Sequence, residues 1–162
     1  MLVYLDTSSL VKRYIQEEGY QAIDKVYLES EAGRVKISFS VWNVGEAIGV
    51  LDRYCRRELI SDNEFRSVIG DLISESLKMM KMNALQILPI TSEILIECWL
   101  LVVKHHIYEA DALQISSSKN AGCDLFLGAD SRLIEAAKKE GINAVHTETE
   151  TRKAIQQLTE AK

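Results

Sequence analysis

The chain alternates short apolar runs with longer segments in which hydrophobic residues recur every three or four positions. Short runs of aliphatic and β-branched residues are typical of buried strands, whereas the longer period is typical of helices that bury one face. This alternation predicts an α/β domain with a mostly parallel sheet. The predicted strands cover residues 2–5, 35–39, 85–88, 124–127 and 143–145.

Helix starts are predicted where a polar residue precedes a periodic apolar segment. Ser40 is a favoured N-cap residue, and the apolar residues after it recur at helical spacing, which places Glu46 in the second turn of a helix. Further helices are predicted after Thr7 and Ser8, from Ser61 or Asp62, after Thr91, across Asp111 and after Asp130.

Four acids stand out from this pattern. Because ligands of parallel sheets bind beyond the carboxyl ends of the strands, Asp6 and Asp130 belong to the edge where a site forms. Each also stands where an aspartate caps a helix, so capping is an even alternative for either residue taken alone. Glu46 and Asp111 interrupt the apolar segments NVGEAIGVL and YEADALQI, where a carboxylate needs a cation, hydrogen bonds or a metal.

The composition narrows the chemistry of these acids. Cys55, Cys98, Cys123 and the three histidines show no zinc-ligand spacing. Oxygen ligands suit a hard cation such as Mg²⁺, which can activate water and stabilise charge on a phosphate, so the acids indicate phosphodiester hydrolysis. The net charge of −5 counts against a protein that binds nucleic acid over a broad basic surface. It counts less against a nuclease, because bound cations neutralise clustered carboxylates.

A chain of 162 residues, 47% of them hydrophobic, has the size and core content of one domain, so a single domain over residues 1–162 is expected. No run of about 18 apolar residues is present, and the N-terminal segment lacks the features of a signal peptide. We therefore expect a soluble, cytoplasmic protein with no membrane association.

Two cationic groups are candidate RNA contacts. Lys12 and Arg13 lie downstream of Asp6, and Arg53, Arg56 and Arg57 lie at the end of the Glu46 helix. For each residue alone, a solvated helix face is the simpler interpretation.

Four segments carry a family resemblance that spans nearly the whole chain. These are VYLDTSSLVKRYIQEEG, SVWNVGEAIGVL, EADALQIS and DLFLGADSRLIEAAKKEGI, which resemble the successive motifs of PIN-domain ribonucleases, including VapC-type toxins. The resemblance implies a three-layer α/β/α sandwich with a central, mostly parallel five-stranded sheet. It also implies that Asp6, Glu46, Asp111 and Asp130 are catalytic acids that bind Mg²⁺ or Mn²⁺.

The same resemblance implies partners for the protein, and it shows one position where this chain differs from the family pattern. Many members cut RNA, form homodimers and are inhibited by an antitoxin protein, and we carry these over as an RNA substrate, a homodimer and an antitoxin partner. Ser8 is a lesser candidate for a hydroxyl near the metal. Members commonly have Thr or Ser two residues before the last acid, where this chain has Gly128.

Two other classes of protein compete with this interpretation. Aspartate-based phosphatases need a second Asp two residues after the first, and Ser8 stands there instead. A catalytically inactive PIN fold that binds RNA or docks a protein is the non-enzymatic alternative, although all four acids are present. Trp42 and Trp99 are expected in the core, with an interface as the alternative that would support a dimer.

Overall fold

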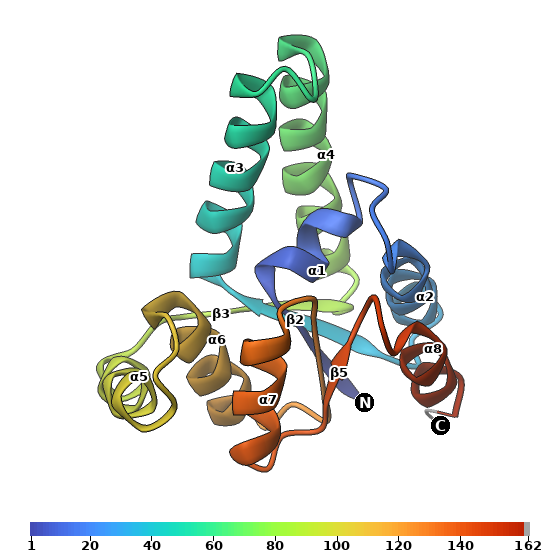
Figure 1. Ribbon diagram of the computed structural model, residues 1–162. Helices are drawn as coiled ribbons and strands as arrows, with labels where there is room; N and C mark the ends of the chain where they lie inside the picture. Colours follow the sequence, from blue (N-terminus) through green and yellow to red (C-terminus); the bar gives the residue numbers. More distant parts are fainter. Residues whose placement is uncertain (161–162) are drawn as a thin grey trace.

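The computed structural model describes residues 1–160, and its centre is a five-stranded sheet in which every strand pair is parallel (Figure 1). The strands are β1 (Leu2–Leu5), β2 (Lys36–Ser40), β3 (Leu85–Leu88), β4 (Leu125–Gly128) and β5 (Ala144–His146). Their spatial order is β3-β2-β1-β4-β5, so β1 is central and β4 is its neighbour. The predicted α/β architecture is confirmed, with a sheet that is wholly rather than mostly parallel.

Eight helices are formed by residues 1–160. They are α1 (Thr7–Lys12), α2 (Tyr20–Glu31), α3 (Val41–Arg56), α4 (Asp62–Lys81), α5 (Ser92–His105), α6 (Glu109–Asn120), α7 (Ser131–Lys139) and α8 (Thr151–Glu160). One face of the sheet packs against α1 to α4 and α8, and the other packs against α5 to α7, which gives three layers. Helices α3 and α4 form a hairpin that rises beyond the sheet (Figure 1).

Alternation along the strands separates two hydrophobic clusters. Val3 and Leu5 of β1 point into the cluster under α1 to α4, whereas Tyr4 between them points toward α5 to α7. Tyr4 stacks there on Phe126 of β4, with ring centroids 5.3 Å apart. Both faces of the central strands are therefore buried, as expected for a parallel sheet covered by helices on both sides.

Three predicted strands begin one residue early: the strands start at Lys36, Leu125 and Ala144. The expectation that both tryptophans are core residues is wrong, because Trp42 is 48% exposed and Trp99 is 55% exposed. About half of each side chain is therefore accessible at the surface formed by residues 1–160. No helix among residues 1–160 has the length and apolar character needed to cross a bilayer.

Candidate active site

The four candidate acids come from four different segments that meet at the carboxyl edge of the central strands. Asp6 follows β1, and Asp130 follows β4 after one intervening residue. These strands are paired in the register Leu5 to Leu127, so their carboxyl ends lie next to each other. Glu46 lies in the second turn of α3 and Asp111 in the first turn of α6.

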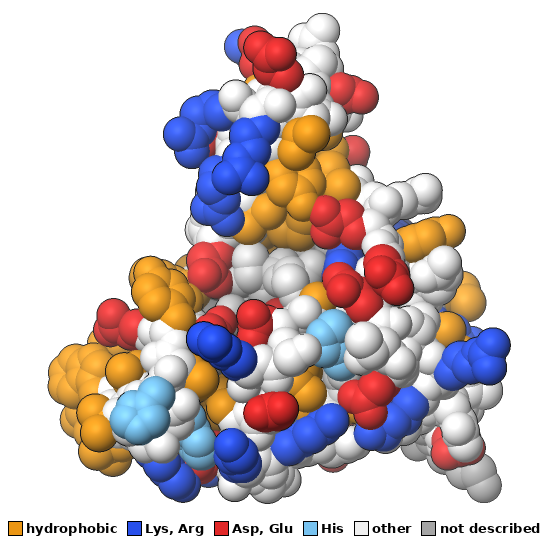
Figure 2. Space-filling model, viewed as in Figure 1, with side chains coloured by type: hydrophobic (Ala, Val, Ile, Leu, Met, Phe, Trp, Pro, Cys, Tyr) orange, Lys and Arg blue, Asp and Glu red, His pale blue; other side chains and the backbone are white. Residues whose placement is uncertain are grey.

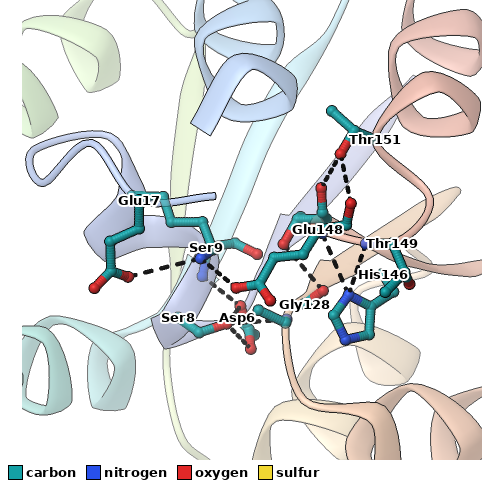
Figure 3. Close-up of polar contacts among 12 residues, drawn as sticks. Asp6, Ser8, Ser9, Glu17, Gly128, His146, Glu148, Thr149 and Thr151 are labelled. Atoms are coloured by element: carbon teal, nitrogen blue, oxygen red, sulfur yellow. Dashed lines mark hydrogen bonds and ion pairs between the residues drawn. The ribbon is translucent and has the colours of Figure 1, made fainter. Parts of the chain in front are cut away.

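Asp6 is a buried carboxylate whose hydrogen bonds fix its orientation. It caps α1, with Oδ1 accepting from the Ser9 backbone N–H at 2.6 Å. The Ser8 hydroxyl lies 2.8 and 2.7 Å from its two oxygens and accepts from the Ala129 N–H at 3.0 Å (Figure 3). Burial raises the pKa of Asp6, while the bonds from Ser8 and Ser9 act in the opposite direction.

Ser8 therefore links Asp6 to the loop between β4 and α7, which carries Asp130. At the start of that loop, a Cβ placed on Gly128 would lie 3.2 Å from Oδ2 of Asp6 and 3.2 Å from the side chain of Ile134. A Ser or Thr side chain at position 128 would crowd the carboxylate. The departure of this chain from the usual family residue thus leaves room for Asp6, and Ser8 provides a hydroxyl beside it.

Glu46 is half-buried and is held through a single oxygen. Its Oε2 accepts a 2.5 Å hydrogen bond from the Thr7 hydroxyl and a 3.4 Å bond from the Gln114 side-chain amide. Within residues 1–160, each of its hydrogen bonds goes to this oxygen. The other oxygen accepts no hydrogen bond from these residues.

Asp111 is the acid most affected by the others. Burial is the largest cause that raises its pKa, from 3.8 to about 6, and the negative charges of Asp130, Asp6 and Glu46 raise it further. No hydrogen bond to a described residue offsets these effects. The structure therefore brings the other three acids within electrostatic range of Asp111, and no cation among residues 1–160 is paired with it.

Asp130 is exposed and caps α7. Its Oδ1 accepts from the backbone N–H groups of Arg132 and Leu133 at 2.8 and 2.9 Å. The N-cap role considered from the sequence is therefore present. Asp130 also belongs to the acid cluster, because its negative charge raises the pKa of Asp111.

Sequence reasoning did not identify three polar residues beneath the acids: Thr7, Asn43 and Gln114. Asn43 is fully buried, Gln114 is 3% exposed and Thr7 is 7% exposed. Thr7 and Gln114 contact Glu46 directly, and Asn43 donates to both of them at 3.1 and 2.8 Å. A signal was present in the sequence, since Asn43 lies three residues before Glu46 and Gln114 lies three residues after Asp111.

Lys12 and Arg13 already have acidic partners within the fold. The Lys12 ammonium is 3% exposed and lies 2.7 Å from Glu148 and 3.6 Å from Glu17. Figure 3 shows these two glutamates, which approach Lys12 from the α1–α2 and β5–α8 loops. Arg13 binds Glu75 and Asp24, each at 2.7 Å. We therefore leave both cations out of the proposed RNA surface.

Arg53, Arg56 and Arg57, at the end of α3, are exposed, and Figure 2 shows cationic side chains gathered along the α3–α4 hairpin above a group of acidic ones. Arg56 pairs with Asp52 at 2.8 Å. Arg53 and Arg57 follow Glu46 by seven and eleven residues, so helical geometry places them on the Glu46 side of α3. Two exposed arginines therefore lie along the side of α3 that carries Glu46.

The acids fit a hard divalent cation by their chemistry. They offer oxygen atoms only, they repel one another, and Asp6 and Glu46 are each held in place by neighbouring donors. Among residues 1–160, no group of three acid, imidazole or thiol side chains lies close enough together to hold a metal ion by itself. Mg²⁺ commonly binds through one or two carboxylates together with water and substrate phosphate oxygens, so an open set suits it.

Comparison with known proteins places this geometry in a family. Three solved structures share the fold: PAE2754 from Pyrobaculum aerophilum, FitAB bound to the IR36 DNA fragment, and FitAcB from Neisseria gonorrhoeae. PAE2754 is 18% identical with a TM-score of 0.65, and the match covers 97% of both chains. FitAB is 13% identical with a TM-score of 0.59, and the match covers 90% of this chain and 94% of that chain. FitAcB is 16% identical with a TM-score of 0.60, and the match covers 90% of this chain and 97% of that chain.

Among curated proteins, none matches the chain. The PIN domain family model matches residues 3–139, a span that contains all four acids and the strands that carry them. PIN domains are generally nucleases. The chain belongs to the PIN domain family.

Proposed function

We propose that this protein is a metal-dependent endoribonuclease that hydrolyses RNA phosphodiester bonds with Asp6, Glu46, Asp111 and Asp130, using Mg²⁺ or Mn²⁺. The observation that carries the proposal is Asp111, a part-buried carboxyl that experiences the negative charges of the three other acids and pairs with no cation among residues 1–160. Such a cluster is costly without a bound cation, and perturbed carboxylates of this kind are typical of functional sites.

A bound divalent cation supplies a nucleophile, by lowering the pKa of water, and stabilises charge on the phosphate. The residues of the protein orient the reaction. Ser8 and the Ser9 N–H fix Asp6, Thr7 fixes Glu46, and the first turn of α7 fixes one oxygen of Asp130. In this proposal, the exposed Arg53 and Arg57 bind phosphates of the RNA strand along α3.

Cleavage of a mixed RNA pool, with each metal and with a chelator, tests the proposal. We expect metal-dependent cleavage that is abolished by Asp6→Asn. The alternative, a catalytically inactive PIN fold that binds RNA or docks a protein, predicts that the wild type and Asp6→Asn bind RNA equally and that neither cleaves it. Sequencing of the cleavage ends would define the target of an active enzyme.

The VapC-like motifs and the FitAB neighbour support a role as the toxin of a toxin–antitoxin pair. In a bacterial host, expression of the wild type is then expected to arrest growth, and Asp6→Asn is expected to relieve the arrest. Equal growth with both proteins would argue against a toxin.

The proposed homodimer is supported by an exposed apolar stripe on α5. Ile96, Trp99, Leu100 and Val103 recur at helical spacing and are 54%, 55%, 66% and 72% exposed. An apolar helix face of this kind is typical of a protein interface, and we propose that a second copy of the chain covers it.

A further inference from the structure

A buried hydrogen-bonded network connects the segments that carry three of the four acids. Asn43 is its centre. Its Nδ2 donates to the Thr7 hydroxyl at 3.1 Å and to Oε1 of Gln114 at 2.8 Å. Gln114 Oε1 also accepts from the Thr7 N–H at 3.1 Å, so the amide of α6 contacts both α1 and α3.

Asn43 is itself fixed by residues behind it. Its Oδ1 accepts from the Ser40 N–H at 2.9 Å, from the Ser40 hydroxyl at 2.6 Å and from the Tyr4 hydroxyl at 2.9 Å. Both ends of the Asn43 side chain are therefore satisfied in a site from which water is excluded, and the amide has one orientation. A buried polar network of this kind is rigid when every member is bonded.

The sequence positions of the network match those of the acids. Thr7 follows Asp6 directly, Asn43 precedes Glu46 by one helical turn, and Gln114 follows Asp111 by one turn. The hydrogen bonds among Thr7, Asn43 and Gln114 therefore fix the relative positions of the three backbone segments that present Asp6, Glu46 and Asp111. Thr7 and Gln114 also restrain one oxygen of Glu46, and the other accepts no hydrogen bond from residues 1–160.

We propose that Thr7, Asn43 and Gln114 are positioning residues that set the spacing of the cation-binding carboxylates, with Gln114 and Thr7 acting through Glu46. This inference rests on the proposed function, because it assigns these residues to the same cation site. Residues that orient metal ligands typically change metal affinity about 10- to 100-fold when they are replaced.

The test is direct Mn²⁺ binding, measured by the EPR signal of free Mn²⁺ without RNA. Gln114→Met keeps the approximate size of the side chain and removes its hydrogen bonds. We expect it to raise the Kd for Mn²⁺ about 10- to 100-fold. The control is Ser30→Ala, which removes a buried hydrogen bond to the Ala84 carbonyl far from the acids and should leave the Kd unchanged. Both variants are expected to melt at a somewhat lower temperature than wild type, so the melting temperature alone does not distinguish a positioning role from general destabilisation.

A double-mutant cycle with Glu46→Gln separates positioning from general destabilisation. If Gln114 acts through Glu46, Gln114→Met should have a smaller effect on the Kd in the Glu46→Gln background. Equal effects in both backgrounds, or a Kd that Gln114→Met does not change, would overturn the inference while the proposed function stands. A wild type that binds no Mn²⁺ would overturn both.

Thr7 provides a second, isosteric test should Gln114→Met fail to fold. Thr7→Val removes the hydroxyl that donates to Glu46, whereas Thr7→Ser keeps it. We expect Thr7→Val to weaken Mn²⁺ binding and Thr7→Ser to restore it. Equal affinities for the two variants would contradict the positioning role.

Discussion

Replacing Asp111 with Asn tests whether the carboxylates repel one another in the metal-free protein. The substitution removes one negative charge at nearly constant shape. Because the folded protein raises the pKa of Asp111 above 3.8 to about 6, ionisation of this group opposes folding. The penalty begins as the pH rises through this interval and is complete above pH 6. The Asn variant should therefore be the more stable protein at neutral pH.

The size of the effect follows from the pKa. A rise from 3.8 to about 6 corresponds to about 3 kcal/mol, at about 1.4 kcal/mol per pH unit. Because water reaches part of this carboxyl and screens it, we expect about 1 kcal/mol to remain. For a chain of this length, about 1 kcal/mol raises the melting temperature by about 2–4 °C.

Thermal melts with a chelator at pH 7.5 and at pH 4 measure this difference. The gap between Asp111→Asn and wild type should be present at pH 7.5 and should narrow as the pH falls to 4, where the folded wild type is already protonated at this position. Asp71→Asn is the matched control, since Asp71 is an exposed acid of α4 and its removal changes the net charge equally.

Mn²⁺ should raise the melting temperature of wild type more than that of Asp111→Asn, because a ligand of the folded state stabilises it according to its affinity. If Asp111→Asn melts well below both wild type and Asp71→Asn in chelator, then the carboxylate makes a favourable buried contact and our account of it is wrong.

Four further predictions address other parts of the molecule. Ser8→Ala should lower cleavage and raise the Mn²⁺ requirement, because Asp6 loses its link to Ala129; unchanged metal titration would remove Ser8 from the site. Replacing Arg53 and Arg57 with Gln should reduce the slope of log affinity for single-stranded RNA against log salt by about 0.7 for each lost phosphate contact, and an unchanged slope would exclude both. Leu100→Asp should shift a homodimer to monomer in sedimentation, whereas a wild type that is already monomeric at micromolar concentration would refute the dimer. Lys104, His105 and Lys119 lower the pKa of Glu140 from 4.5 to about 2, so the ionised carboxylate stabilises the fold, and this stability is lost as the pH falls from 4.5 to 2. Thermal melts of Glu140→Gln should therefore show a loss of stability at pH 7 but not near pH 2.

The strands and the order of the acids could be predicted because both depend on local pattern. Buried parallel strands are short apolar runs, and an acid directly after such a run lies at the carboxyl edge wherever the strand sits in the sheet. Glu46 and Asp111 were recognisable because a charge in an apolar helix needs a partner. Strand ends were misplaced by one residue because hydrogen bonds, which the sequence does not display, define them.

Other features depend on residues distant in sequence and could not be predicted. Lys12 resembles a surface cation, yet it is buried because Glu148, 136 residues away, pairs with it. Asn43, the third residue of α3, resembles a simple capping-box partner of Ser40, and its contact with Gln114 of α6 gives it a second role. Trp99 is a large apolar residue of the kind usually found in cores. It is nevertheless 55% exposed, because no other segment among residues 1–160 packs over that part of its side chain.

The central position of β1 determines when during synthesis the site can form. β1 is synthesised about 120 residues before its partner β4, and the residues directly after β4 supply both the Ala129 N–H that contacts Ser8 and Asp130. Until then one edge of β1 remains open, and Asp6 lacks the neighbouring loop. A nascent chain at the ribosome, which is itself surrounded by RNA, thus completes its carboxylate edge only after most of the domain has been translated.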